Sequence, residues 1–141
     1  MSVAWSVAVA AVFVWLGMVS AISFLEAPLK FRAPGVTLQL GLGIGRLVFR
    51  ALNTCETVLA AVILIALFLD DAPAAVEAAL LVAVAALMIQ VSVVRRALTR
   101  RTDAVLAGAE GPRSNAHYVY VVLEAVKVVG LMVTGVLLMA S

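Results

Sequence analysis

The stretch HYVYVVLEAVKVV, residues 117–129, is apolar enough to cross a membrane as a helix, yet it carries a carboxylate and an ammonium near its middle. Four polar side chains recur in it at spacings of three, four and three residues: His117, Tyr120, Glu124 and Lys127. At about 100° per residue, an α-helix places these four within roughly 80° of arc on one face. A polar stripe on a helix in lipid must face protein or water, so it predicts a membrane protein with a charged interior.

The composition of the whole chain agrees with this interpretation. Of its 141 residues, 65% are hydrophobic and 13% are charged, and the mean hydropathy is +1.18. A soluble domain is about half apolar and about a quarter charged. The length predicts a single domain over residues 1–141, and the net charge of +2 gives no indication of nucleic-acid binding.

Few residues in the sequence suit metal or cofactor chemistry. One cysteine, Cys55, excludes an intrachain disulfide, and one histidine excludes a bis-histidine haem within a single chain. No zinc-ligand spacing, Walker motif or nucleophile elbow is present. We therefore expect no metal and no cofactor.

Four apolar segments are predicted to span the membrane, at about residues 3–25, 44–69, 74–94 and 116–139. Together they predict an all-α fold, a four-helix transmembrane bundle. The stretch 26–45 is interrupted by Pro28 and Pro34 and carries basic residues, so we expect a short interfacial segment after the first helix.

Small residues indicate where helices approach closely. Gly41 and Gly45 form a Gly-x-x-x-Gly pair, and Ser20 and Ser23 lie three residues apart in the first segment. The glycine run does not fit the dinucleotide-binding pattern and no strand precedes it. Both sets therefore predict helix–helix contacts.

The positions of the basic residues predict the orientation. The first loop contains Lys30 and Arg32, with Arg46 at its edge, and the second contains two aspartates and no basic residue. The third contains Arg95, Arg96, Arg100, Arg101 and Arg113. The positive-inside rule places loops one and three in the cytoplasm and both termini outside, as in a bacterial inner membrane. The first four of these arginines are also expected to contact anionic lipid headgroups, at about 1 kcal/mol each.

A second polar stripe lies on the segment 44–69, within about 120° of arc: Arg46, Arg50, Asn53 and Glu56. At a rise of about 1.5 Å per residue, Glu56 and Lys127 both lie ~15 Å below the cytoplasmic boundary. On the same scale Arg50 lies ~6 Å deep and Glu124 ~10 Å deep. Opposite charges at similar depths predict two ion pairs, Glu56 with Lys127 and Arg50 with Glu124, on neighbouring helices.

Three further polar residues, Asn53, Gln90 and Tyr120, are expected to complete the hydrogen bonding of these pairs. Buried ion pairs can set helix register without taking part in chemistry. Ionisable groups inside a membrane are nevertheless functional by default, and here they accompany an asparagine, a tyrosine and a histidine. We therefore predict a polar cavity open toward the cytoplasm.

Three classes of function remain open. The first is transport or permeation of a small anionic or amphipathic molecule. Arg46 and Arg50 would attract its anionic group, and Glu56, Glu124 and Lys127 would gate the path or relay protons. The second is an accessory subunit of a larger membrane complex, with the charged stripe contacting a partner helix. The third is a membrane enzyme acting on a lipid-soluble substrate, with Glu124 or His117 as acid or base. Because four helices form a thin bundle, a homo-oligomer or a membrane-complex partner is expected.

The stretch WLGMVSAISFLEAPLKFR, residues 15–32, has an aromatic–x–Gly pattern, then a proline and basic residues. It resembles small four-helix proteins of the copper-resistance-D-like group, as does the opening of the last helix at His117. That group contains bacterial domains of unknown function, eukaryotic transmembrane relatives and a protoporphyrinogen-oxidising branch. The porphyrin branch uses a histidine in its first helix, where this chain has none, so the resemblance implies no site residues here.

Overall fold

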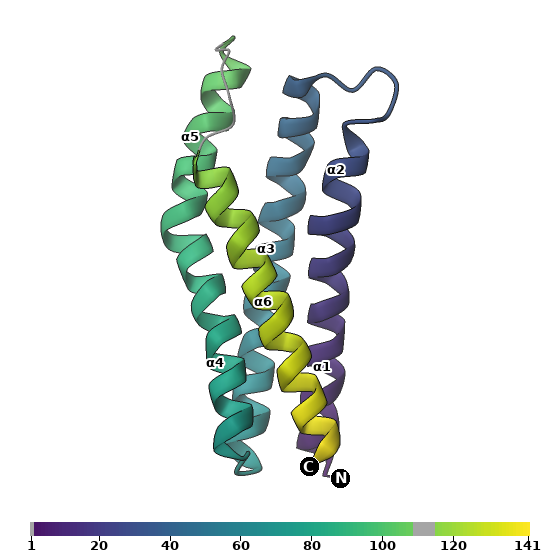
Figure 1. Ribbon diagram of the computed structural model, residues 1–141, viewed down its shortest axis with the longest axis vertical. Helices are drawn as coiled ribbons and strands as arrows, with labels where there is room; N and C mark the ends of the chain where they lie inside the picture. Colours follow the sequence, from purple (N-terminus) through teal and green to yellow (C-terminus); the bar gives the residue numbers. More distant parts are fainter. Residues whose placement is uncertain (1, 109–114) are drawn as a thin grey trace.

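The computed structural model describes residues 2–108 and 115–141, which are helical apart from short connections. The elements are α1 (Val3–Val19), η1 (Ser20–Glu26), α2 (Ala27–Lys30), α3 (Leu38–Leu69), α4 (Ala74–Ile89), η2 (Gln90–Val94), α5 (Arg95–Leu106) and α6 (Asn115–Ala140). The π-helical segments η1 and η2 continue the helices on either side of them. The result is four segments long and apolar enough to cross a membrane, which confirms the all-α four-helix bundle (Figure 1).

The four segments alternate in direction along the bundle. Both termini and the turn between α3 and α4 lie at one end, here called the terminal end, and α2 and α5 lie at the other, the basic end (Figure 1). The segment α1 packs against α3 and α6, and α4 packs against α6 and more lightly against α3. The main packing partners of α3 and α6 are therefore other helices. Side chains of the two nevertheless meet inside the bundle, in the Glu56–Lys127 salt bridge and between the rings of Phe49 and Tyr120, so the predicted facing of the two polar stripes is confirmed there.

An apolar core fills the part of the bundle nearer the termini. Its largest buried members come from all four segments: Val12, Trp15, Ile63, Leu80, Leu131 and Leu138. The helices α4 and α6 approach closely at Gly130, where an added Cβ would lie 3.3 Å from the carbonyl oxygen of Ala79. The half of the bundle nearer the terminal end is consequently closed by tightly packed apolar side chains.

The predicted interfacial segment is much shorter than expected, because the first helical segment continues to Lys30 and α3 begins at Leu38. Pro28 does not end the helix, since it lies in the first turn of α2, directly after the π-helical η1. A wider π-helical turn relieves the clash between a proline ring and the preceding turn. Thr37 then caps α3, its hydroxyl oxygen accepting from the Leu40 N–H at 3.1 Å.

The third span also continues beyond its predicted end at residue 94. It runs through η2 into α5, so the basic cluster lies on a helix and not in a loop. No glycine or proline interrupts residues 95–106, and the helix ends before Gly108, whose φ is +99°. An Arg46–Asp103 salt bridge joins α5 to α3. Arg113, predicted for the same loop, lies outside the described residues.

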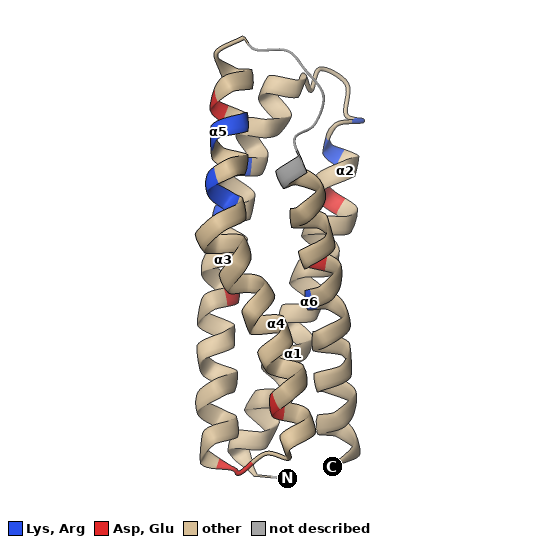
Figure 2. Cartoon of the chain, turned by 60° about the vertical axis from the view of Figure 1, so that its left-hand side comes forward, with Lys and Arg blue, Asp and Glu red and all other residues tan. Residues whose placement is uncertain are grey.

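The last helix, Asn115–Ala140, confirms the predicted span 116–139 within a residue at each end. Basic residues concentrate on α5, with one more on α2, whereas the turn at the terminal end is acidic (Figure 2). Asp71 in that turn has a φ of 46°, a left-handed conformation that aspartate tolerates. The orientation across the membrane stays a prediction drawn from this charge asymmetry.

Candidate functional site

Three charged side chains meet inside the bundle, and we call them the Glu–Lys–Glu cluster: Glu56, Glu124 and Lys127. The Lys127 Nζ atom lies 2.5 Å from Glu56 Oε2 and 2.5 Å from Glu124 Oε1. None of the three is more than 1% exposed. The predicted Glu56–Lys127 pair is confirmed, and it spans the bundle diagonally from α3 to α6.

The predicted Arg50–Glu124 pair is wrong. Glu124 pairs with Lys127, one helical turn along α6, and Arg50 is exposed. At about 100° per residue, Arg50 lies about 120° around α3 from Glu56. With Glu56 directed at the bundle centre, the Arg50 side chain must therefore leave the interior.

The Glu56 carboxylate accepts hydrogen bonds from two further side chains. Its Oε2 atom accepts from the Trp15 indole N–H at 2.7 Å. The Asn53 amide is oriented so that its NH2 donates to Glu56 Oε1 at 3.1 Å while its carbonyl accepts from Arg95 at 2.7 Å. The Tyr120 hydroxyl lies 3.4 Å from the same amide. The buried carboxylate is thus surrounded by donors, as a charge in a dry interior requires.

The Glu124 carboxylate is held by residues of the two π-helical segments. Ser23 on η1 hydrogen-bonds to its Oε2 atom, and Gln90 on η2 donates to Oε1 at 2.7 Å. Gln90 also donates to the Tyr120 carbonyl at 3.2 Å. Single-turn π segments are frequent at functional sites because they re-aim side chains that an α-helix would place elsewhere. Here both of them aim polar groups at one carboxylate.

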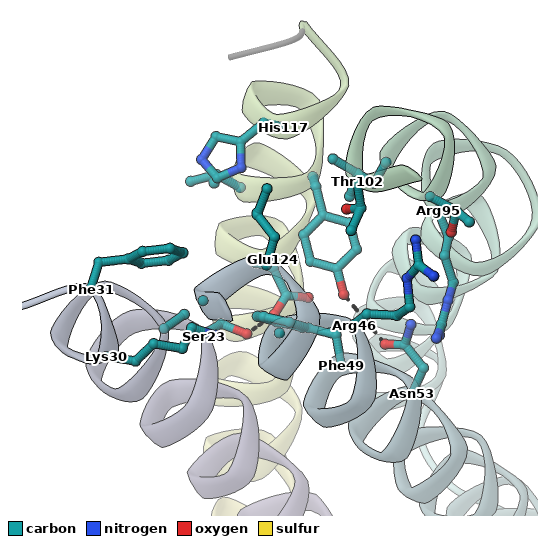
Figure 3. Close-up of a pocket in the computed structure, with 18 of the residues that line it drawn as sticks. Ser23, Lys30, Phe31, Arg46, Phe49, Asn53, Arg95, Thr102, His117 and Glu124 are labelled. Atoms are coloured by element: carbon teal, nitrogen blue, oxygen red, sulfur yellow. Dashed lines mark hydrogen bonds between the residues drawn. The ribbon is translucent and has the colours of Figure 1, made fainter. Parts of the chain in front are cut away.

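A pocket of about 230 Å³ lies between this cluster and the basic end, among α2, α3, α5 and α6 (Figure 3). Glu124, Asn53 and Tyr120 line it on the side of the cluster, and His117 lines it nearer the basic end. Its apolar lining includes Phe31, Phe49 and Leu98. A pocket thus lies beside the predicted charges, but most of its surface is apolar and not polar as predicted. Its opening toward the cytoplasm stays a prediction.

Three basic side chains line the pocket: Lys30, Arg46 and Arg95. One acidic side chain, Glu124, lines it as well. The Lys30 Nζ atom lies 3.9 Å from Glu26, and 5.5 Å and 5.9 Å from the ring centroids of Phe31 and Phe49. Arg46 is paired with Asp103 on α5. Among the described residues, no acidic side chain forms a salt bridge with Arg95. Lys30 and Arg46 thus each lie close to an acidic side chain, whereas Arg95 is the pocket cation without one among the described residues.

The glycines of α3 make room for side chains and not for a second helix backbone. A Cβ at Gly41 would lie 2.2 Å from the Phe31 ring, and one at Gly45 would lie 3.1 Å from Lys30 Nζ. The predicted close approach is real, but it seats two residues of the first segment against the pocket. In this way Gly41 and Gly45 position one cation and one aromatic wall.

The predicted site residues divide between the two features. The pocket is lined by Arg46, Asn53, His117, Tyr120 and Glu124. Glu56, Gln90 and Lys127 belong to the cluster or hydrogen-bond to it. Arg50 contributes to neither.

Sequence reasoning missed several residues of this site, and four of them form its ion pairs or hydrogen bonds: Trp15, Ser23, Lys30 and Arg95. A tryptophan at mid-span, away from the interfacial belt where tryptophan is enriched, was a usable signal for Trp15. No protein-family model, curated protein or solved structure matches the chain. The resemblance of residues 15–32 to the copper-resistance-D-like group therefore stays a prediction.

Proposed function

We propose that the protein transports a small amphipathic anion, which it binds in the pocket at the basic end. The observation that carries this proposal is the Arg95 guanidinium, which lines a largely apolar pocket and has no acidic partner among the described residues. Arg95 donates a hydrogen bond to the neutral Asn53 amide. A guanidinium presents several N–H donors, which suits a carboxylate, sulfonate or phosphate group.

The other residues that line the pocket favour binding of an amphipathic ligand over binding of a small inorganic anion. Phe31, Phe49 and Leu98 offer apolar surface beside the cations, as in most small-molecule sites. Lys30 lies near two of these aromatic rings and adds positive charge where the apolar surface begins. An anionic headgroup near Arg95 and an apolar body against the rings would satisfy both kinds of surface.

The closed terminal half supports transport by alternating access. In the predicted orientation the pocket belongs to the cytoplasmic half, and the cluster and the apolar core lie between it and the outside. The two elements that flank the pocket, α2 and α5, each follow a π-helical segment. Rearrangement at η1 and η2 would change the pocket without breaking the core.

Arg95→Gln is expected to weaken binding of tritiated octanesulfonate, a permanently charged amphiphile, by about tenfold or more. A hydrogen bond to a charged group contributes roughly 1.5–3 kcal/mol, which corresponds to that loss. The measurement is equilibrium binding to protein in phosphatidylcholine nanodiscs. Octanol and octyltrimethylammonium, which carry no negative charge, should compete poorly.

Arg96→Gln is the matched control, because Arg96 is the next residue on α5, is exposed and does not line the pocket. It should bind octanesulfonate like the wild type. Equal losses in both variants would mean that general surface charge, and not this pocket, attracts the anion. Adding phosphatidylglycerol to the discs separates two sources of ligand, since competition by it would identify a lipid headgroup as the resident anion.

A further inference from the structure

The Glu–Lys–Glu cluster contains one more acid than base. Two glutamates share one lysine, and all three side chains are buried in the middle of a membrane-spanning bundle. Arg95 reaches the Asn53 carbonyl and forms no salt bridge with either carboxylate. An unbalanced charge in a low-dielectric interior is strongly unfavourable, and binding one proton would remove it.

The hydrogen-bond partners of Glu56 do not favour binding of that proton. Its Oε2 atom accepts from the Lys127 ammonium and the Trp15 indole N–H, and its Oε1 atom accepts from the Asn53 NH2 group. None of these three groups can accept a hydrogen bond in return. A proton on either oxygen of Glu56 would therefore point at another donor.

Glu124 differs at one oxygen. Its Oε1 atom accepts from Lys127 and Gln90, but the one hydrogen bond of its Oε2 atom among the described residues is with the Ser23 hydroxyl. A serine hydroxyl both donates and accepts, so it can donate to a carboxylate and accept from a carboxylic acid. We propose that Glu124 is a proton-binding site, with the proton on Oε2 hydrogen-bonded to Ser23, while Glu56 and Lys127 stay ionised as a neutral pair.

The same carboxyl group lines the anion pocket, which links the proton to the ligand. Without its proton, Glu124 places a negative charge beside the bound anion; with its proton, it does not. Anion binding is therefore stronger when Glu124 is protonated, and by linkage anion binding takes up a proton. The link rests on the proposed function, whereas the proton site rests on the cluster alone. Together they describe proton–anion symport.

Several other titratable or charged groups can contribute to a pH dependence. Those that share the pocket with Glu124 are Lys30 from α2, Arg46 from α3, Arg95 from α5, and His117 and Tyr120 from α6. Lys127 and Glu56 contact it from the cluster, and Glu26 and Asp103 pair with pocket cations. His117 is the one whose ordinary titration lies near neutral pH, so it needs its own control.

Infrared spectroscopy of the protein in nanodiscs at neutral pH tests the proton site without any ligand. We expect a carbonyl band of a protonated carboxyl group that shifts in deuterated buffer. The band should be absent in Glu124→Gln and unchanged in Glu77→Gln, whose glutamate is exposed on α4. Absence of the band in the wild type, or its survival in Glu124→Gln, would overturn the assignment.

Two conservative variants locate the proton without removing a charged group. Ser23→Ala should shift the frequency of the band, because the acid loses its hydrogen-bond acceptor. Trp15→Phe, which alters only the Glu56 side of the cluster, should leave the frequency unchanged. A band that moves in Trp15→Phe and not in Ser23→Ala would place the proton on Glu56 and contradict the assignment.

The link to anion binding is tested with octanesulfonate, which stays ionised across the pH range. Its affinity for the wild type should fall by up to about tenfold per pH unit as Glu124 loses its proton, the limit for one linked proton. Glu124→Gln should bind tightly at every pH, and His117→Asn should keep the pH dependence. A dependence lost in His117→Asn and kept in Glu124→Gln would overturn the link. No octanesulfonate binding in any variant would contradict the proposed function and leave the infrared result standing.

Discussion

Lys127→Met is expected to cause the largest loss of folded protein of any single substitution in the site. It removes the cation that lies 2.5 Å from both buried carboxyl groups and leaves the ionised Glu56 carboxylate without its partner. Removing one partner of a buried ion pair costs about 3–5 kcal/mol. The yield of monodisperse protein and its thermal unfolding midpoint in one detergent provide the measurement.

Two further variants show whether charge is the cause. Arg50→Met removes a cation of the same stripe on α3, but one whose side chain is exposed, and it should behave like the wild type. The double variant Glu56→Gln with Lys127→Met removes the ionised pair together and should recover much of the yield. A Lys127→Met protein as stable as the wild type would mean that the carboxylates already face water.

Gly130→Leu is expected to have the second-largest effect, through packing and not through charge. An added Cβ at this position would lie 3.3 Å from the Ala79 carbonyl oxygen and 3.4 Å from the Ala83 backbone nitrogen. Because these are backbone atoms of α4, they cannot move aside without separating the helices. Overpacking of this kind destabilises by about 1–3 kcal/mol. Thermal unfolding in detergent should show the loss as a lower midpoint.

Gly17→Leu is the matched control, since nothing lies within 4 Å of a Cβ at that exposed glycine of α1. Its unfolding midpoint should equal that of the wild type. If the two leucine variants are equally stable, α4 and α6 do not pack backbone to backbone at Gly130. If both are equally destabilised, the loss of helical glycine itself is responsible.

The sequence predicted the number of helices and the Glu56–Lys127 pair because both depend on simple periodicities. Apolar length decides how many helices span, and the rise per residue decides which charges share a depth. The depth of a residue in the membrane does not determine the direction in which its side chain points, which is why the predicted pairing of Arg50 with Glu124 is wrong. A rotation of about 120° around α3 separates Arg50 from Glu56, and that decides which of them enters the bundle.

The pocket was harder to predict because its residues come from helices that continue past their apolar part. Lys30 and Arg95 were assigned to loops, since charge and proline normally end a membrane span. The π-helical segments bring Ser23 and Gln90 onto Glu124, and a one-residue register change of this kind leaves no clear trace in hydropathy. A contact between residues far apart in the sequence, such as the hydrogen bond from Trp15 to Glu56, leaves no pattern in the sequence near either residue. The one indication here was the position of the tryptophan in the middle of a span.

Thiol labelling of one pocket position tests the central claim, that an anion binds in a pocket on the cytoplasmic side. In a Cys55→Ser background, Thr99→Cys introduces a thiol on the α5 wall of the pocket, and Asp71→Cys introduces one in the turn at the terminal end. A membrane-impermeant maleimide should reach position 99 only from the inside and position 71 only from the outside. Octanesulfonate should slow labelling at position 99, whereas octyltrimethylammonium should not. Labelling of position 99 from the outside, or at the same rate with and without octanesulfonate, would contradict the account.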